Sequence, residues 1–203
     1  MIKNVVFDFG QVLIQFVPSY IISQYTTDSD DASLLEEVLF DRLYWDRLDD
    51  GSIDNEQILS HSASRLPDRL HDTARRILYG WTNNLPEIDG MHDLVVDLKN
   101  QYGVKLVLLS NIADYFADHI SEFPILSHFD GYVLSGVCKR VKPRPEIFAY
   151  LCEQFDLVPS ETVFVDDNPA NIAGARDFGI NAYLFDGDSA RLRAYLDQVI
   201  EKK

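Results

Sequence analysis

The chain opens with VVFDFG (residues 5–10), an apolar run that carries a single acid, Asp8. Its short length, β-branched residues and closing glycine predict a buried strand. A carboxylate at the end of such a strand is costly unless a cation or a metal partners it. A second run of this kind, FVDDNP (residues 164–169), ends in Asp166 and Asp167. We therefore expect two strands to bring their acids together at one edge of a parallel sheet.

The rest of the chain alternates between two kinds of pattern. Strands are predicted over residues 3–8, 104–109, 131–134 and 162–166, with a weaker pattern over 180–185. Helices are predicted between them, over residues 90–101, 114–121, 145–155, 169–177 and 189–200. Near-continuous apolar strands are typical of a parallel sheet that is covered on both faces. The alternation predicts an α/β fold with a doubly wound parallel sheet.

The first connection is much longer than the others. About 95 residues separate the first two predicted strands, whereas a crossover helix needs far fewer. Residues 16–88 show helical periodicity in at least three segments and no convincing strand. We therefore predict a core made of residues 1–15 and 89–203, with residues 16–88 forming a helical cap inserted after the first strand.

Composition limits the partners that the protein can have. A formal net charge of −15 repels a phosphate backbone, so we expect no nucleic-acid binding. No apolar run approaches the roughly 20 residues of a membrane span, and we expect no membrane partner and a cytoplasmic location. Cys138 and Cys152 lack a metal-binding spacing, so we expect reduced thiols. We expect a monomer or a weak dimer.

Four polar blocks follow predicted strands, at the edge where open α/β sheets bind ligands. They are Asp8–Val12, Leu108–Asn111, Val141–Pro145 and Val165–Asn171. A carboxylate can attack phosphorus when its own charge and that of the phosphate are neutralised. A divalent cation held by the three acids would do this, and hard oxygen ligands favour Mg²⁺.

The other blocks supply groups that bind phosphate. Lys142 offers an ammonium and Ser110 a hydroxyl, while the amides at Asn111 and beyond would begin a helix with its positive dipole end. Each feature also has a structural interpretation. Asp8 could cap a strand, the Asp166–Asp167 pair could mark a helix N-terminus, and Lys142 could lie on the surface. The four blocks together favour phosphoryl chemistry.

These blocks resemble the four motifs of the haloacid dehalogenase superfamily, whose members are mostly magnesium-dependent phosphatases. The resemblance covers nearly the whole chain and implies a Rossmann-like core with a helical cap. It implies that Asp8 is the nucleophile that forms an aspartyl-phosphate, that Ser110 binds phosphate and that Lys142 is the catalytic lysine. By the same likeness Asp167 binds Mg²⁺, and Asp166 is an accessory acid that reaches the metal in some relatives. The implied substrate is a small phosphorylated metabolite.

The first motif departs from the usual pattern at Gly10. Relatives carry a second aspartate there, which protonates the leaving group and lends its backbone carbonyl to the metal. The carbonyl of Gly10 remains available as a metal ligand, but the acid is missing. Loss of such a group costs about 10²–10⁴ in rate. Three explanations remain open: a good leaving group, a proton donor in the cap, or a slow or non-catalytic protein.

This Asp-x-Gly-x-Val form is similar to a subgroup that contains bacterial α-D-glucose-1-phosphate phosphatase. RVKPRPEIF (residues 140–148) and the cap stretch YWDRLDDGSI (residues 44–53) are similar as well. The likeness implies sugar 1-phosphates among the substrates. Trp45 would then stack on a sugar, Arg47 would reach a polar group, and Gln11 would donate a hydrogen bond to the leaving oxygen. Alternatively, Trp45 packs in the cap and Arg47 pairs with a nearby acid.

Two other functions remain as alternatives. A metal-independent 2-haloacid dehalogenase also lacks the second aspartate, but the three acids would repel one another without a cation. A phosphate-binding relative that has lost catalysis would account for Gly10.

Overall fold

The computed structural model describes residues 1–200, which contain a parallel sheet of five strands. The strands are β1 (Asn4–Phe7), β2 (Lys105–Ser110), β3 (Gly131–Leu134), β4 (Thr162–Asp166) and β5 (Asn181–Leu184). Their order is β3-β2-β1-β4-β5, so that β1 lies in the centre between β2 and β4. All neighbouring strands run parallel. The predicted α/β fold is confirmed.

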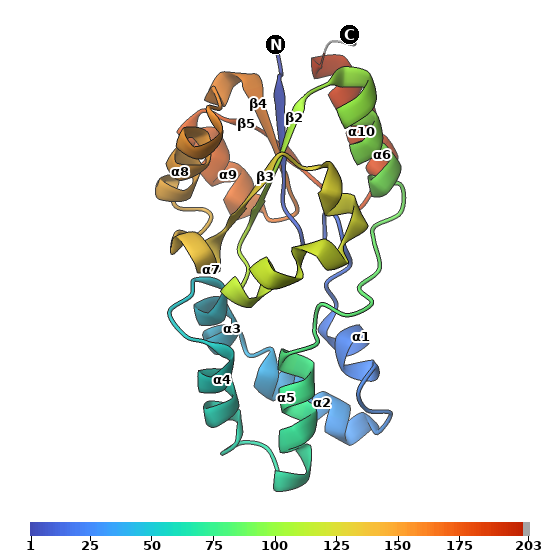
Figure 1. Ribbon diagram of the computed structural model, residues 1–203, viewed down its shortest axis with the longest axis vertical. Coiled ribbons are helices and arrows are strands. Elements are labelled where there is room, and N and C mark those ends of the chain that lie inside the picture. Colours follow the sequence, from blue (N-terminus) through green and yellow to red (C-terminus); the bar gives the residue numbers. More distant parts are fainter. Residues whose placement is uncertain (201–203) are drawn as a thin grey trace.

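Helices cover both faces of the sheet (Figure 1). Alternate residues of a strand point to opposite faces, and in β1 Val6 packs in one apolar cluster while Val5 and Phe7 pack in the other. The first cluster includes residues of α8 (Pro145–Phe155) and α9 (Pro169–Phe178). The second includes residues of α6 (Met91–Asp97) and α10 (Ser189–Val199). The sheet is therefore buried on both sides, as its apolar runs predicted.

Three elements of the core differ from the prediction in detail. The helix predicted over 90–101 continues beyond α6 as a π-helical turn, Leu98–Tyr102. The segment predicted as a helix over 114–121 is a 3₁₀-helix, η3 (Asp114–Glu122), because a short apolar pattern does not distinguish 3.0 from 3.6 residues per turn. α7 (Ser135–Cys138) was not predicted, since four residues are too few to show a period. Two further 3₁₀ segments are η4 (Pro124–His128) and η5 (Pro159–Glu161).

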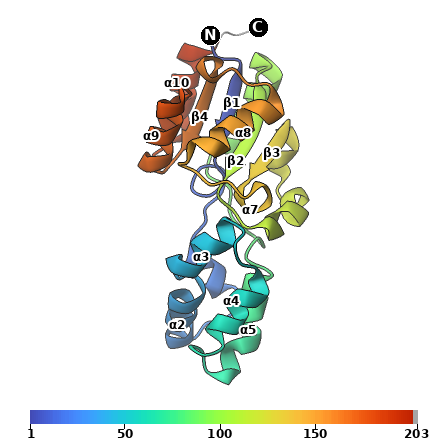
Figure 2. The same cartoon turned by 90° about the vertical axis from the view of Figure 1, so that its left-hand side faces the viewer.

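Between β1 and α6 the chain forms a series of helices, besides isolated β-bridges that join Ile14 to Gly10 and to Glu87. The helices are α1 (Pro18–Ser23), α2 (Ser29–Leu39), α3 (Arg42–Asp49), α4 (Asn55–Ser62), η1 (Asp68–Leu70) and α5 (His71–Leu78). Aspartates cap three of them, and Asp54 forms a capping box with Gln57. These helices lie beyond one end of the sheet (Figures 1 and 2). They fall within residues 16–88, and the division of the chain into a core and a cap stays a prediction.

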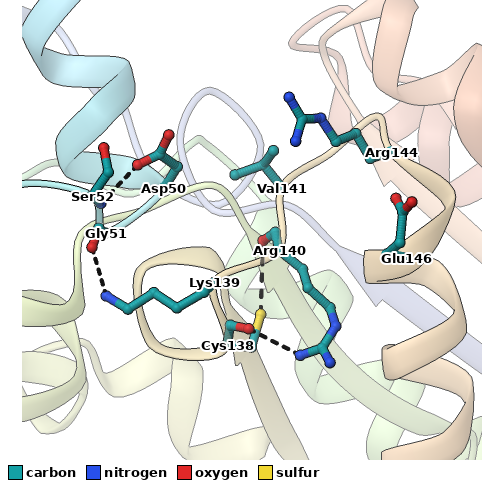
Figure 3. A pocket seen from close by; sticks show the side chains of 9 residues that line it. All are labelled: Asp50, Gly51, Ser52, Cys138, Lys139, Arg140, Val141, Arg144 and Glu146. Atoms are coloured by element: carbon teal, nitrogen blue, oxygen red, sulfur yellow. Dashed lines mark hydrogen bonds between the residues drawn. The ribbon is translucent and has the colours of Figure 1, made fainter.

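The end of α3 is attached to the core through α7. Ser135 Oγ donates a hydrogen bond to the carbonyl oxygen of Asp49 (2.5 Å), and Lys139 Nζ donates one to the carbonyl oxygen of Gly51 (2.9 Å), as Figure 3 shows for the second. Gly51 has a φ of +69°, and a Cβ there would lie 2.6 Å from the carbonyl oxygen of Gly136. A glycine is therefore needed at this junction both for its backbone conformation and for close approach.

Two further observations concern the residues described. Cys138 and Cys152 are both free thiols, in agreement with the prediction. None of the helices within residues 1–200 is long and apolar enough to cross a membrane.

The junction predicts different effects of alanine at two glycines with positive φ. Gly51→Ala should lower the free energy of unfolding by about 2–4 kcal/mol, because left-handed strain adds to a steric clash. Gly187→Ala is the matched control: its φ is +88°, but no atom lies within 4 Å of the added Cβ. It should cost about 1–2 kcal/mol. Urea denaturation measures both, and equal losses would contradict the proposed close packing at Gly51.

Candidate active site

The sheet order brings the polar ends of three strands together. Phe7 pairs in register with Leu108 of β2 and with Val165 of β4. The chain then leaves the sheet at Asp8, and Asp166 is completely buried beside it. One carboxylate oxygen each of Asp8, Asp166 and Asp167 lies within 4.8 Å of the others. The predicted cluster of acids is therefore present at the carboxyl edge of the sheet.

Lys142 lies between two of these acids and is almost inaccessible to solvent. Its Nζ is 2.8 Å from Asp8 Oδ1 and 2.7 Å from Asp166 Oδ2. The lysine does not directly follow β3, because α7 and a loop come first. Asn111 positions it: the Asn111 side chain accepts a hydrogen bond from the Lys142 amide (2.9 Å) and donates one to the Lys142 carbonyl (3.0 Å). The Asn111 side chain is thus engaged in holding the lysine, whereas the prediction for this segment concerned its backbone amides.

The two acids after β4 have different surroundings. Both oxygens of Asp166 accept from Asn171 Nδ2 at 3.1 Å, and Oδ1 also accepts from the Asn168 amide at 2.8 Å. Together with Lys142 these donors occupy the Asp166 carboxylate. Asp167 is exposed and lines the cavities described below. Of the pair, Asp167 is therefore the acid with oxygens free to bind a cation.

Burial and like charges disturb the ionisation of the cluster. Burial raises the pKa of Asp8 to about 6; Lys142 acts in the opposite direction and Asp166 adds to the rise. Burial and the charge of Asp166 also raise the pKa of Asp167. Burial alone would lower the pKa of Lys142, but the charges of Asp8 and Asp166 outweigh it and raise that pKa. Lys142 therefore keeps its positive charge. That single charge does not balance the negative charges of the three acids.

The residues fit a divalent cation. Three carboxylates and one ammonium leave a formal charge of −2, which one divalent cation would neutralise. Carboxylate and carbonyl oxygens are the ligands that Mg²⁺ prefers. Asp8, Asp167 and the carbonyl of Gly10 are the groups here that would hold it.

Two adjoining cavities lie over the acids. The smaller, of about 160 Å³, is lined from the core by Asp8, Phe9, Gly10, Gln11, Ser110, Asn111, Ile112 and Asp167, and otherwise by Phe16, Arg42, Trp45, Asp49 and Trp81. A more open one of about 420 Å³ also contains Asp8 and Asp167 and adds Lys142. A third hollow, of about 610 Å³ and drawn in Figure 3, lies beside Lys139 and Arg140 and is lined by none of the clustered acids. The first two cavities are therefore the candidate site.

One face of α3 contributes to this site. Arg42, Trp45 and Asp49 line the smaller cavity, and their spacing of three and then four residues places them on one side of a helix. Trp45 also stacks on Phe40 with a ring-centroid distance of 4.6 Å, so it packs against an aromatic neighbour, and its stacking on a sugar stays a prediction. Arg47, predicted to reach a polar group of the substrate, is exposed and lines neither cavity, whereas Arg42 lines both. The helical spacing was the signal that could have identified Arg42.

The phosphate-binding groups after β2 also differ from the prediction. Ser110 lines the smaller cavity as expected. No α-helix follows Asn111, because the next element is the 3₁₀-helix η3, and the Ile112 amide donates to Ser135 Oγ (2.8 Å). That amide is therefore committed within the fold. Gln11 lines the cavity, and its Nε2 donates to the carbonyl of Phe16 (3.3 Å).

Comparisons with known proteins agree with this architecture. Residues 2–179 match the family described as haloacid dehalogenase-like hydrolase. D-ribitol-5-phosphate phosphatase from Bacteroides thetaiotaomicron is 26% identical over 192 residues, which cover 90% of this chain and 91% of that protein. A solved structure described as a predicted HAD-like family hydrolase from Porphyromonas gingivalis gives a TM-score of 0.72 at 27% identity, with 99% of each chain covered. A HAD family enzyme from Bacteroides thetaiotaomicron, solved with magnesium and inorganic phosphate, gives 0.71 at 24% identity and covers 95% of this chain and 99% of its own.

The raised pKa of Asp8 predicts how stability changes with pH in the metal-free protein. Because the folded pKa of about 6 exceeds the usual 3.8, protonated Asp8 favours the folded state. This contribution to the unfolding free energy amounts to about 3 kcal/mol. It is complete below about pH 3.8 and is lost as the pH rises through 6. Relative to the parent, Asp8→Asn should therefore gain about 2–3 kcal/mol of unfolding free energy between pH 4 and pH 8. Urea denaturation with a chelator present measures this, and a difference that is independent of pH would contradict it.

Proposed function

Because this chain belongs to the haloacid dehalogenase-like hydrolase family, we propose that it is a Mg²⁺-dependent phosphatase of small phosphomonoesters. The reaction proceeds through an aspartyl-phosphate on Asp8. The observation that carries this proposal is the arrangement of Asp8 between the buried ammonium of Lys142 and the free carboxylate of Asp167, in a small cavity beneath α3.

The residues of the core divide the chemistry among them. Asp8 attacks phosphorus, and Lys142 neutralises charge on the nucleophile and on the phosphate oxygens. The Ser110 hydroxyl donates a hydrogen bond to a phosphate oxygen. Asp8, Asp167 and the carbonyl of Gly10 hold Mg²⁺, which when bound supplies positive charge to the phosphate and the acids. Water then hydrolyses the intermediate and releases inorganic phosphate.

Asp166 and Asn111 act on Lys142 and not on the substrate. The Asp166 carboxylate is saturated by donors from Lys142, Asn168 and Asn171. Asn111 fixes the backbone of the lysine with two hydrogen bonds. Both are therefore positioning residues, which hold the ammonium against Asp8.

Two observations favour a small polyhydroxylated substrate. The relative named D-ribitol-5-phosphate phosphatase matches nearly the whole chain, and the cavity of about 160 Å³ offers Trp45 and Trp81 together with the polar side chain of Arg42. Phosphorylated polyols and sugars are the substrate class that we propose. Sugar 1-phosphates are included because of the likeness at residues 44–53 and 140–148, and their anomeric oxygen is a comparatively good leaving group.

The main prediction concerns the nucleophile and the metal. With Mg²⁺ present, the parent protein should release phosphate from a panel of sugar and polyol phosphates. Asp8→Asn should lower turnover at least about 10³-fold while the fold is retained, because the nucleophile is lost. A chelator should abolish turnover in the parent, and added Mg²⁺ should restore it.

Phosphate release and circular dichroism measure these outcomes. Full turnover by Asp8→Asn would rule out the aspartyl-phosphate mechanism. A folded parent that binds phosphate but releases none from any ester would support the non-catalytic alternative that Gly10 raises. Chloride release from a 2-haloacid without metal would instead indicate a dehalogenase.

The two arginines of α3 provide a matched test of the substrate-binding face. Both side chains are exposed, but only Arg42 lines the cavities. Arg42→Ala should raise KM about tenfold, as expected for loss of one charge-assisted hydrogen bond. Arg47→Ala should leave KM near that of the parent. Steady-state kinetics on the best substrate of the panel measures both, and a larger effect at Arg47 would contradict the assignment.

A further inference from the structure

Cleavage of a phosphate ester leaves an oxygen that needs a proton. Gly10 has no group to supply it. Of the acids within residues 1–200, only Asp8, Asp49 and Asp167 line both cavities of the site. Asp46 and Asp50 line the larger cavity of about 420 Å³ but not the smaller one. Since Asp8 is the nucleophile and Asp167 is a metal ligand in the proposed function, Asp49 is the remaining acid.

We propose that Asp49, contributed by cap helix α3, is the general acid that protonates the leaving oxygen in place of a residue at position 10. The inference rests on the proposed function, because it assigns a proton donor to that same reaction.

The backbone of Asp49 is fixed relative to the core of the site. Its carbonyl accepts from Ser135 Oγ (2.5 Å), and the same Ser135 Oγ accepts from the amide of Ile112 (2.8 Å). Ile112 follows closely on Ser110, which lines the cavity. One hydroxyl therefore joins the end of α3 to the segment that leads out of β2. The bond from Lys139 to Gly51 holds the next turn of the chain against the core (Figure 3).

The Asp49 carboxyl is in a state suited to donating a proton. Within residues 1–200 it accepts no hydrogen bond and forms no ion pair, in contrast to Asp46, which pairs with Arg42 at 2.9 Å. Burial, followed by the charges of Asp46 and Asp8, raises the pKa of Asp49 well above its ordinary value; Arg42 and Lys142 oppose this without overcoming it. A neutral carboxyl also avoids repulsion from a phosphate.

The uncharged and cationic side chains of the smaller cavity cannot replace Asp49 as the proton donor. Gln11 carries an amide, which has no acidic proton at neutral pH, and the guanidinium of Arg42 remains charged in proteins. Ser110 offers a hydroxyl of the same kind as the product alcohol. Asp49 is therefore the acid of α3 that lines both cavities together with Asp8, and its carboxyl is not assigned to the metal or to the nucleophile.

The proton balance of the reaction is complete with this residue. As Asp8 Oδ bonds to phosphorus, the bond between phosphorus and the leaving oxygen breaks, and the Asp49 proton moves to that oxygen to give an alcohol. Asp49 is then a carboxylate. When water attacks the aspartyl-phosphate, Asp49 accepts a proton from it, the bond between phosphorus and Asp8 breaks, and inorganic phosphate leaves. Both acids return to their starting states.

The test compares substrates with different leaving groups. For the parent and for Asp49→Asn, kcat/KM is measured with p-nitrophenyl phosphate, whose phenolate needs no proton, and with ribitol 5-phosphate, whose alkoxide does. Loss of a general acid should lower kcat/KM about 10²–10⁴-fold for the alkyl ester and at least about tenfold less for the aryl ester. An equal loss on both esters would indicate a structural role and would overturn the inference.

Three variants serve as controls. Arg47→Ala, on the same helix α3 but lining neither cavity, should keep the parent's ratio between the two esters. Asp49→Glu keeps an acid and should recover part of the alkyl activity. Gly10→Asp should restore alkyl turnover to Asp49→Asn, since a Cβ at Gly10 would meet only Phe16 Cβ, at an ordinary 3.5 Å.

The outcomes separate this inference from the proposed function. A parent that hydrolyses neither ester nor any other in the panel overturns both. An active parent whose Asp49→Asn and Asp49→Glu variants keep its ester ratio overturns the role of Asp49 alone. If Asp49→Asn does not fold, the Asp49→Glu ratio decides, because a longer acid should alter alkyl turnover more than aryl turnover.

Discussion

The site depends on one buried ion triad, in which the ammonium of Lys142 lies between Asp8 and Asp166. Removing a single member of such a group leaves an unpaired charge in an apolar surrounding, which is strongly destabilising. The surrounding hydrogen bonds serve this triad, since Asn111 holds the lysine backbone and Asn171 holds the second acid. The strand order makes it possible, because β1 and β4 are neighbours and end at the same level. Asp8, the proposed nucleophile, is thus placed by the same interaction that neutralises part of its charge.

The sheet and the acidic cluster could be predicted from the sequence because both follow from local patterns. Apolar runs identify buried parallel strands, and parallel strands end at a common edge, so acids that follow them must converge. The contribution of the cap could not be predicted in the same way. Arg42 and Arg47 are equally polar, and only the helical phase of α3, starting after the Asp41 cap, places Arg42 on the cavity side. The engagement of the Ile112 amide depends on Ser135 of α7, an element too short to leave a periodic pattern.

The structure divides the proposed chemistry between two parts of the chain. Strand ends of the core supply charge for phosphoryl transfer, whereas one face of α3 supplies an arginine, an aromatic ring and a carboxyl. Helices that cover a site also exclude water when they close over it. If the proton donor resides on the cap, the acid is in place only when the cap covers the substrate. Protonation of the leaving group is then linked to exclusion of bulk water, which a donor at position 10 of the core would not require.

Charge also relates substrate binding to metal binding. The protein carries a formal charge of −15, and the clustered acids with Lys142 carry −2. A phosphate ester brings further negative charge into a small, largely buried space, where electrostatic interactions are stronger than in water. Without a cation the proposed site would therefore repel a phosphorylated substrate, and a free haloacid anion would meet the same repulsion. A divalent cation reverses this balance, so cation and phosphate favour one another's binding, as linkage between two sites requires. In the proposed function, the free carboxylate of Asp167, which Lys142 does not pair, is the feature that would make the site dependent on a metal.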